Sequence, residues 1–190
     1  MAKTGERKAQ ILQTLAAMLE NPKGERITTA LLAARLEVSE AALYRHFASK
    51  AQMFEGLIEF IEQTVFSLVN KIQAEEQDAV KQVEQTVATL LGFAQKNPGM
   101  TRVLIGDALV NEDERLLSRV NQLLDRLEAS LRQSARLAVT AGTFPADWDV
   151  NAYANAVIAF VIGRWHQFAK SGFKRPPMEG WQQQWRVFAA

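Results

Sequence analysis

Apolar residues recur every three or four positions along most of this 190-residue chain, a spacing typical of amphipathic helices. Strand-like alternation is nowhere sustained, and Gly and Pro are few. The pattern therefore predicts an all-α fold. Capping and turn residues divide it into helices over residues 8–20, 29–36, 40–47, 49–74, 78–96, 100–110, 113–138 and 148–170, with a short helix in the tail 176–190. The apolar row predicted for the helix over 49–74 consists of Met53, Phe54, Leu57, Ile58, Ile61, Val65, Leu68 and Ile72.

Two of these helices are short and meet at a tight turn near the N-terminus. The hydroxyl of Thr28 or Thr29 can cap the first, and that of Ser39 can cap the second, because each can accept a backbone N–H that the first turn leaves unpaired. The second helix is about 12 Å long and fits a major groove about 12 Å wide. Helix, turn and helix in this order predict a helix-turn-helix DNA-binding unit.

The second helix carries side chains suited to DNA. Ala41 and Ala42 are small enough to approach base edges, whereas Tyr44, His46 and Lys50 can donate to phosphate oxygens. An amphipathic helix whose Tyr and His merely pack inside the protein would show a similar pattern. The residues that we expect to contact DNA are Thr28, Thr29, Ser39, Ala41, Ala42, Tyr44, Arg45, His46 and Lys50.

The two long C-terminal helices carry much apolar surface. The helix over 148–170 is apolar around most of its circumference, and in a chain this small a second subunit is the natural cover. We expect a homodimer in which 113–138 and 148–170 pair across a two-fold axis as a four-helix bundle. Its two recognition helices, about 34 Å apart, would then bind a palindromic duplex. The expected interface residues are Leu123, Leu127, Leu131, Val157, Phe160, Val161 and Trp165.

Composition and charge narrow the function classes. Cys is absent, which excludes disulfides and thiolate chemistry, and no apolar run of about 18 residues or signal-peptide core occurs, so we expect a cytoplasmic protein. The two histidines lie 120 residues apart, and no metal, P-loop or dinucleotide motif is present, so no enzyme activity, metal or cofactor is expected. Residues 1–50 carry eight Lys or Arg against five Glu, whereas 51–100 carry three against seven acidic residues. A basic end before an acidic segment is typical of nucleic-acid binding at that end.

The stretch 32–50 resembles the DNA-binding signature of the tetracycline-repressor-type regulators. It follows the pattern L-A-x-x-L-E-V-S-x-x-x-L-Y-x-H-F-x-x-K without a gap. The family usually has Gly in the turn, where this chain has Glu37. Because Glu tolerates positive φ poorly, we expect the turn either to be strained by about 1 kcal/mol or to adopt a slightly different conformation. The implied domains are a DNA-binding domain over 1–48 and a helical regulatory and dimerisation domain over 49–190.

Residues 39–62, 90–109 and 119–133 are similar to the nucleoid-occlusion factors of Gram-negative bacteria, a branch of this family. The resemblance implies a nucleoid-associated protein that binds palindromic chromosomal sites and antagonises polymers of the tubulin-like cell-division GTPase FtsZ. It places the surface for that partner on the helices over 49–74 and 78–97. Leu68 and Thr89 depart from the pattern, which has an Arg and a Leu there. The residues that match are Phe60, Gly92, Lys96 and Asn97.

Three alternatives remain open. Phe60 and Gly92 could face a neighbouring helix of the same chain instead of a partner. The C-terminal domain could hold the small-molecule effector of a ligand-gated repressor, and a cavity of several hundred Å³ there would favour this. A purely protein-binding adaptor would show no salt-sensitive affinity for DNA. The residues that would line an effector pocket include Phe93, Met100, Trp148 and Trp165.

Overall fold

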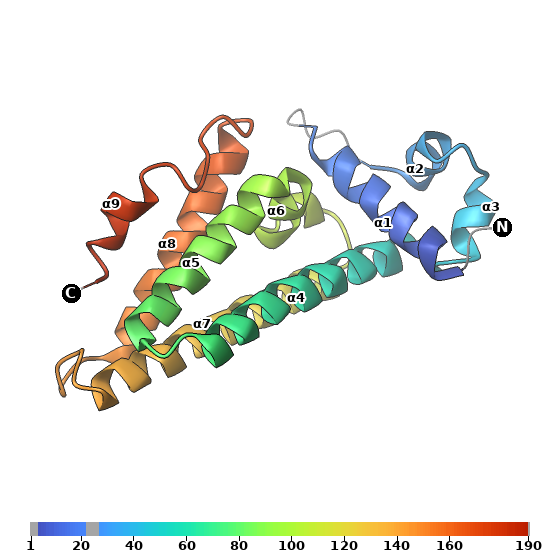
Figure 1. The fold of residues 1–190 in the computed structure, drawn as a ribbon. Coiled ribbons are helices and arrows are strands. Elements are labelled where there is room, and N and C mark those ends of the chain that lie inside the picture. Colours follow the sequence, from blue (N-terminus) through green and yellow to red (C-terminus); the bar gives the residue numbers. More distant parts are fainter. Residues whose placement is uncertain (1–3, 22–26, 190) are drawn as a thin grey trace. The chain divides into compact units, whose positions relative to one another are not determined.

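The structure, a computed structural model, describes residues 4–21 and 27–189 (Figure 1). The prediction of an all-α fold is confirmed. None of the described helices is long and apolar enough to cross a membrane. The helices are α1 (Thr4–Leu19), α2 (Thr29–Arg35), α3 (Glu40–Tyr44), α4 (Lys50–Glu75), α5 (Ala79–Lys96), α6 (Pro98–Leu104), the 3₁₀ helix η1 (Asp107–Leu109), α7 (Glu114–Thr140), α8 (Val150–Lys170) and α9 (Trp181–Trp185).

Several boundaries differ from the prediction. α1 begins four residues earlier than residue 8, and the predicted helix over 100–110 breaks at Gly106, whose φ of 78° cannot continue a right-handed helix. α8 begins at Val150 and is capped by Asp149, whose carboxylate accepts the backbone N–H groups of Asn151 and Ala152 at 3.0 Å each. In the tail only the five residues of α9 are helical.

The register of α4 is predicted correctly up to Val65 and wrongly beyond it. Residues Met53 to Val65 of the predicted row are buried, but Leu68 is exposed and Val69 is buried in its place. Both residues are apolar, and both lie near the spacing of a helix with 3.6 residues per turn. The packing of the folded chain, which the pattern does not contain, decides between them.

The chain divides into two compact units, one of Met1–Ile61 with Asn97–Val120 and one of Glu62–Lys96 with Asn121–Ala190. α4 and α7 each contribute residues to both units. The first unit contains α1, α2, α3 and α6. The domain boundary predicted after residue 48 stays a prediction.

In the first unit, α6 packs closely against α1. A Cβ built on Gly99 would lie 2.0 Å from the carbonyl oxygen of Ala16, so a larger residue cannot occupy this position without movement of the backbone. Arg102 donates to the carbonyls of Leu19 and Asn21, at 3.2 Å each, and pairs with Asp107 at 2.5 Å. The guanidinium thus satisfies carbonyls at the C-terminal end of α1 that the helix itself leaves unpaired.

In the second unit, α5 and α8 pack around Trp165. Trp165 is 1% exposed, and its indole N–H donates to the carbonyl of Leu90 at 3.2 Å. Arg164, on the same helix, donates to the carbonyls of Pro176, Pro177 and Glu179 and so holds the C-terminal segment in place. The centre of this unit is therefore filled by side chains.

Candidate nucleic-acid interface

The chain between α2 and α3 turns through a left-handed residue, Glu37. Its φ of 55° decides between the two expected alternatives in favour of the strained turn. The N–H of Glu37 bonds to the carbonyl of Ala34 (3.1 Å), and that of Val38 bonds to the carbonyl of Ala33 (3.0 Å). This is the Schellman ending of a helix, in which Gly is the usual residue because it has no Cβ. Glu37 therefore holds a strained conformation, at a cost of about 1 kcal/mol.

Each helix of the reading head, which we define as residues 28–50, begins at a capping hydroxyl. Thr28 Oγ1 accepts the N–H of Leu31 at 3.2 Å, and Ser39 Oγ accepts the N–H of Ala42 at 3.3 Å. Both predicted caps are therefore present, with Thr28 instead of Thr29 at the start of α2. Both capping residues are exposed, and their role in DNA contact stays a prediction.

α3 is shorter than predicted and ends at Tyr44 instead of residue 47. The N–H of His46 bonds to the carbonyl of Leu43 (2.9 Å), a three-residue spacing that tightens the backbone into a turn. Leu43 and Phe47 are buried. His46 is half-buried, and its Nδ1 has no hydrogen-bond partner among the described residues. The outer surface consists of exposed Ala41, Tyr44 and Arg45 and half-buried Ala42.

Three polar side chains link α2 to α3. The hydroxyl of Tyr44, which is 44% exposed, donates to Thr29 Oγ1 at 3.4 Å. The hydroxyl of Thr29 in turn donates to the Glu40 carboxylate at 2.5 Å. Tyr44 and Thr29 were expected as DNA contacts, but Glu40 was not. Its position after the Ser39 cap was the available signal, although an acidic residue in a first helical turn usually serves only the helix.

Lys50 lies in an ion pair. Its ammonium group pairs with Glu112, its side chain is 22% exposed, and Nζ lies 5.7 Å from the centre of the Phe54 ring. A phosphate contact would require Lys50 to leave Glu112. Sequence reasoning missed Glu112 because 62 residues separate the partners, and no local pattern reports such a contact.

Asp113 and Tyr153, both outside the reading head, have shifted pKa values. Hydrogen bonds from the side chain and backbone of Arg115 lower the pKa of the Asp113 carboxyl to about 2, so it stays ionised at neutral pH. Burial raises the pKa of the Tyr153 hydroxyl, which donates to the carbonyl of Phe188 at 3.1 Å. Neither group has a feature that suggests catalysis, and the described residues contain no cluster of three potential metal ligands.

The four residues expected to bind the division GTPase lie on or next to helix surfaces. Phe60 is 47% exposed on α4. Gly92 is half-buried on α5, and a Cβ built there would have no atom of the described chain within 4 Å. Lys96 is exposed at the end of α5, and Asn97 is half-buried just before α6. Their binding role stays a prediction.

The residues expected at the dimer interface require a correction. Phe160 is half-buried, but the other six have their side chains enclosed by their own chain, so they have almost no area left to offer a second copy. The apolar circumference of α8 is covered largely from within the protomer. The six enclosed residues are Leu123, Leu127, Leu131, Val157, Val161 and Trp165.

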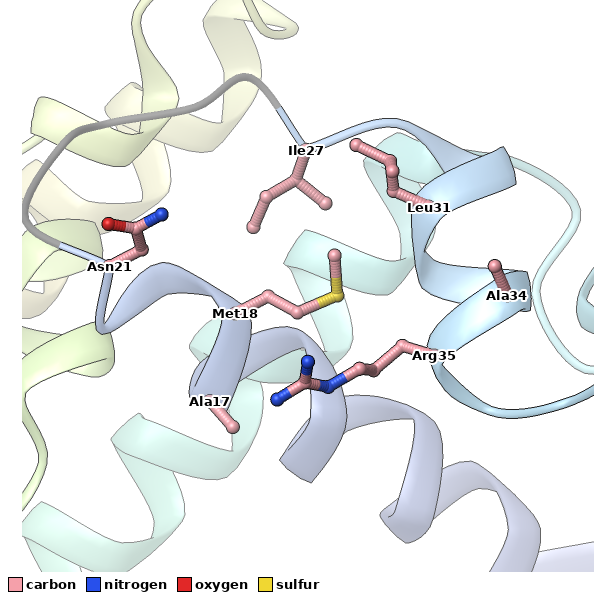
Figure 2. Close-up of a pocket in the computed structure, with 7 residues that line it drawn as sticks. All are labelled: Ala17, Met18, Asn21, Ile27, Leu31, Ala34 and Arg35. Carbon is pink, nitrogen blue, oxygen red and sulfur yellow. The ribbon is translucent and has the colours of Figure 1, made fainter.

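Neither of two described hollows is lined by the residues expected around an effector. The first, about 550 Å³, lies between α1 and α2, where Figure 2 shows Met18, Ile27 and Leu31 around it. Leu31 is exposed there. The second, about 430 Å³, is an open hollow whose lining includes the exposed Gln77 and Leu137. Of the expected lining, Phe93, Met100 and Trp165 are buried, and Trp148 is half-buried.

Comparisons with known proteins agree with the helix-turn-helix geometry. The family described as "Bacterial regulatory proteins, tetR family" matches residues 23–57. The family described as "Tetracyclin repressor-like, C-terminal domain" matches residues 77–190. Among solved structures, the fatty acid degradation regulator FadR from Bacillus halodurans superimposes with a TM-score of 0.81 at 14% identity, over 99% of this chain and 97% of that one. At that identity the likeness concerns the fold alone.

Among curated proteins, the chain is similar to two described as "Nucleoid occlusion factor SlmA". The protein from Alteromonas mediterranea is 50% identical over 186 residues, which cover 98% of this chain and 95% of that one. The protein from Marinomonas sp. is 50% identical over 188 residues, with the same two coverages. The similarity therefore extends over the reading head, α4, α5 and the C-terminal helices.

Proposed function

Because the chain belongs to the tetR family of bacterial regulatory proteins and, within it, to the nucleoid occlusion factors named SlmA, we propose that it is a nucleoid occlusion factor. In this proposal the protein binds palindromic chromosomal DNA as a homodimer. In the DNA-bound state it antagonises FtsZ polymers. The observation that carries the proposal is the 50% identity over nearly the whole chain. A relative that shared only the head would support DNA binding alone.

The reading head supports the DNA-binding part. Tyr44 and Arg45 are exposed on the outer surface of α3, next to the small side chains of Ala41 and Ala42. Small residues let the backbone approach base edges, and the polar ones can reach phosphates. The nine residues expected to contact DNA remain our proposed contacts, with Lys50 conditional on release from Glu112.

For the dimer, we assign contact to the outer face of α8. Gly163 is an exposed mid-helix glycine there, with no atom of the described chain within 4 Å of a built Cβ. Phe160 is half-buried against the rings of Trp181 and Phe188 of its own chain and lies beside this face. A small residue lets another helix approach closely. The enclosed Leu and Val residues of α7 and α8 then support this face from beneath. Other small exposed residues on it are Ala152, Ala156 and Ala159.

For FtsZ, Gly92 is the most informative residue. A glycine inside a helix costs about 1 kcal/mol relative to Ala. Nothing in the described chain occupies the space where its Cβ would lie, so internal packing does not require glycine. Close approach by a partner explains it, and exposed Lys96 on the same helix supplies a cation. Phe60, which is 47% exposed on α4, is proposed separately as an apolar contact.

The test is co-sedimentation of FtsZ polymers, formed with GTP, in the presence of the full-length protein. We expect less polymer in the pellet when a palindromic duplex selected by the protein is added. Lys96→Ala should weaken this effect, whereas Lys81→Ala, which removes another exposed lysine of α5, should leave it intact. An antagonism that DNA does not change would favour a ligand-gated repressor instead.

A further inference from the structure

Glu40 introduces a negative charge into a surface that has to approach phosphates. It is the first residue of α3, is exposed, and accepts a hydrogen bond from Thr29 on α2 at 2.5 Å. We propose that Glu40 is a specificity-determining residue that exchanges this internal donor for an amino group of a base when the protein binds its site. The inference rests on the proposed DNA binding.

The hydroxyl protons of Tyr44 and Thr29 are already donated within the protein itself. A hydroxyl has one proton, and that of Tyr44 points to Thr29 while that of Thr29 points to Glu40. Phosphate oxygens accept hydrogen bonds and do not donate them. If Thr29 turns its proton to a phosphate, the Glu40 carboxylate therefore loses its donor.

A carboxylate without a hydrogen-bond donor is unfavourable in a DNA interface. It loses its hydrating water there, and no other group compensates its charge. In the major groove the amino groups are N4 of cytosine and N6 of adenine. The neighbouring residues Ala41 and Ala42 are small and leave the carboxylate access to base edges. A site with an amino group at this position satisfies Glu40, whereas other sites are rejected. Contacts to the backbone and recognition of the base are thereby coupled through Thr29.

The test is selection from a library of random-sequence duplexes with the full-length protein, followed by fluorescence anisotropy on the selected duplex and on a random one. For the wild type we expect a palindrome with cytosine or adenine fixed at one position of each half-site. Glu40→Ala should lose the preference there, with discrimination falling about tenfold, while affinity for the random duplex rises. Glu37→Ala, the control, removes an exposed charge of the same head outside the hydrogen-bonded group and should keep the preference.

A third variant separates the two halves of the inference. Thr29→Val keeps the shape of the side chain but removes the internal donor, so affinity for random duplexes should fall while the base preference persists. Glu40 is exposed, so unfolding midpoints should match the wild type. If Ala lowers the midpoint, Glu40→Met, which keeps the side-chain length but has no oxygen to accept from a base amino group, replaces it. Unchanged base preferences in the folded Glu40 variant would overturn the inference. A wild type that selects no sequence would instead refute the proposed DNA binding.

Discussion

The reading head and the outer surface of α5 carry the two proposed binding surfaces, yet their residues are held in opposite ways. In the head, Ser39 caps a helix, Thr29 bonds to Glu40, and Lys50 pairs with Glu112. On α5, Gly92 faces open space and Lys96 is exposed. The head thus uses the same atoms for folding and for its proposed function. On α5, a substitution can change the proposed binding without a loss of stability.

Three positions make this difference measurable. Gly99 is a glycine that close packing demands, because a Cβ would meet the carbonyl of Ala16 at 2.0 Å. Gly92 is a glycine that nothing in the described chain demands. Glu37 occupies a left-handed conformation that would favour glycine. Substitutions at these positions should therefore change the free energy of unfolding in different directions and by different amounts.

The largest effect is expected for Gly99→Ala. The added methyl group overlaps a backbone carbonyl, and overpacking of this kind costs about 3 kcal/mol or more when the backbone has to move. Urea unfolding followed by circular dichroism measures the free energy of unfolding. If stability is unchanged, the steric argument fails, and with it the contrast between Gly99 and Gly92.

Ser39→Ala should lower stability and DNA affinity together. The loss of the cap on α3 costs about 1 kcal/mol, and a frayed α3 positions its side chains less well for the duplex. Urea unfolding and fluorescence anisotropy on one preparation give both values. Weaker binding with unchanged stability would show that Ser39 serves DNA alone, against the shared use of atoms in the head.

Gly92→Ala should raise stability and lower FtsZ antagonism. The helix gains about 1 kcal/mol from the better propensity of Ala, and the methyl group fits without a clash in the protomer. The same methyl group obstructs the proposed close approach of the partner. Unfolding, duplex affinity and polymer sedimentation are measured side by side, with duplex affinity expected to stay constant. A variant that is stabilised and fully active would remove Gly92 from the proposed surface.

Glu37→Gly should have the smallest effect, a gain of about 0.5 kcal/mol. Relief of the left-handed strain contributes about 1 kcal/mol, and the greater freedom of Gly in the unfolded chain offsets part of it. The shift in the thermal unfolding midpoint is small, so Glu37→Ala, which keeps the strain, serves as the reference. A loss of stability on exchange to Gly would show that Glu37 makes a contact beyond the turn.

Local signals were readable from the sequence, and contacts between distant segments were not. The caps Thr28 and Ser39 and the strained Glu37 follow from neighbouring residues, and each was predicted. The pair of Lys50 with Glu112 joins segments 62 residues apart and has no local signature.

The apolar positions show the same limit. The pattern placed Leu68 in the core, but the packed structure buries Val69. The pattern also indicated that α8 is buried on most sides. It did not show that other helices of the same chain bury most of its apolar surface. Leu127 and Val161 are therefore enclosed in the protomer, and contact with a second copy is left to the outer face of α8.

Sedimentation velocity, with and without a palindromic duplex, tests the central claim most directly. At micromolar concentration the protein should sediment with twice the chain mass of 21.2 kDa, and two or more protomers should bind each duplex, with binding that weakens as salt rises. Single copies that ignore the duplex even in dilute buffer would contradict the account.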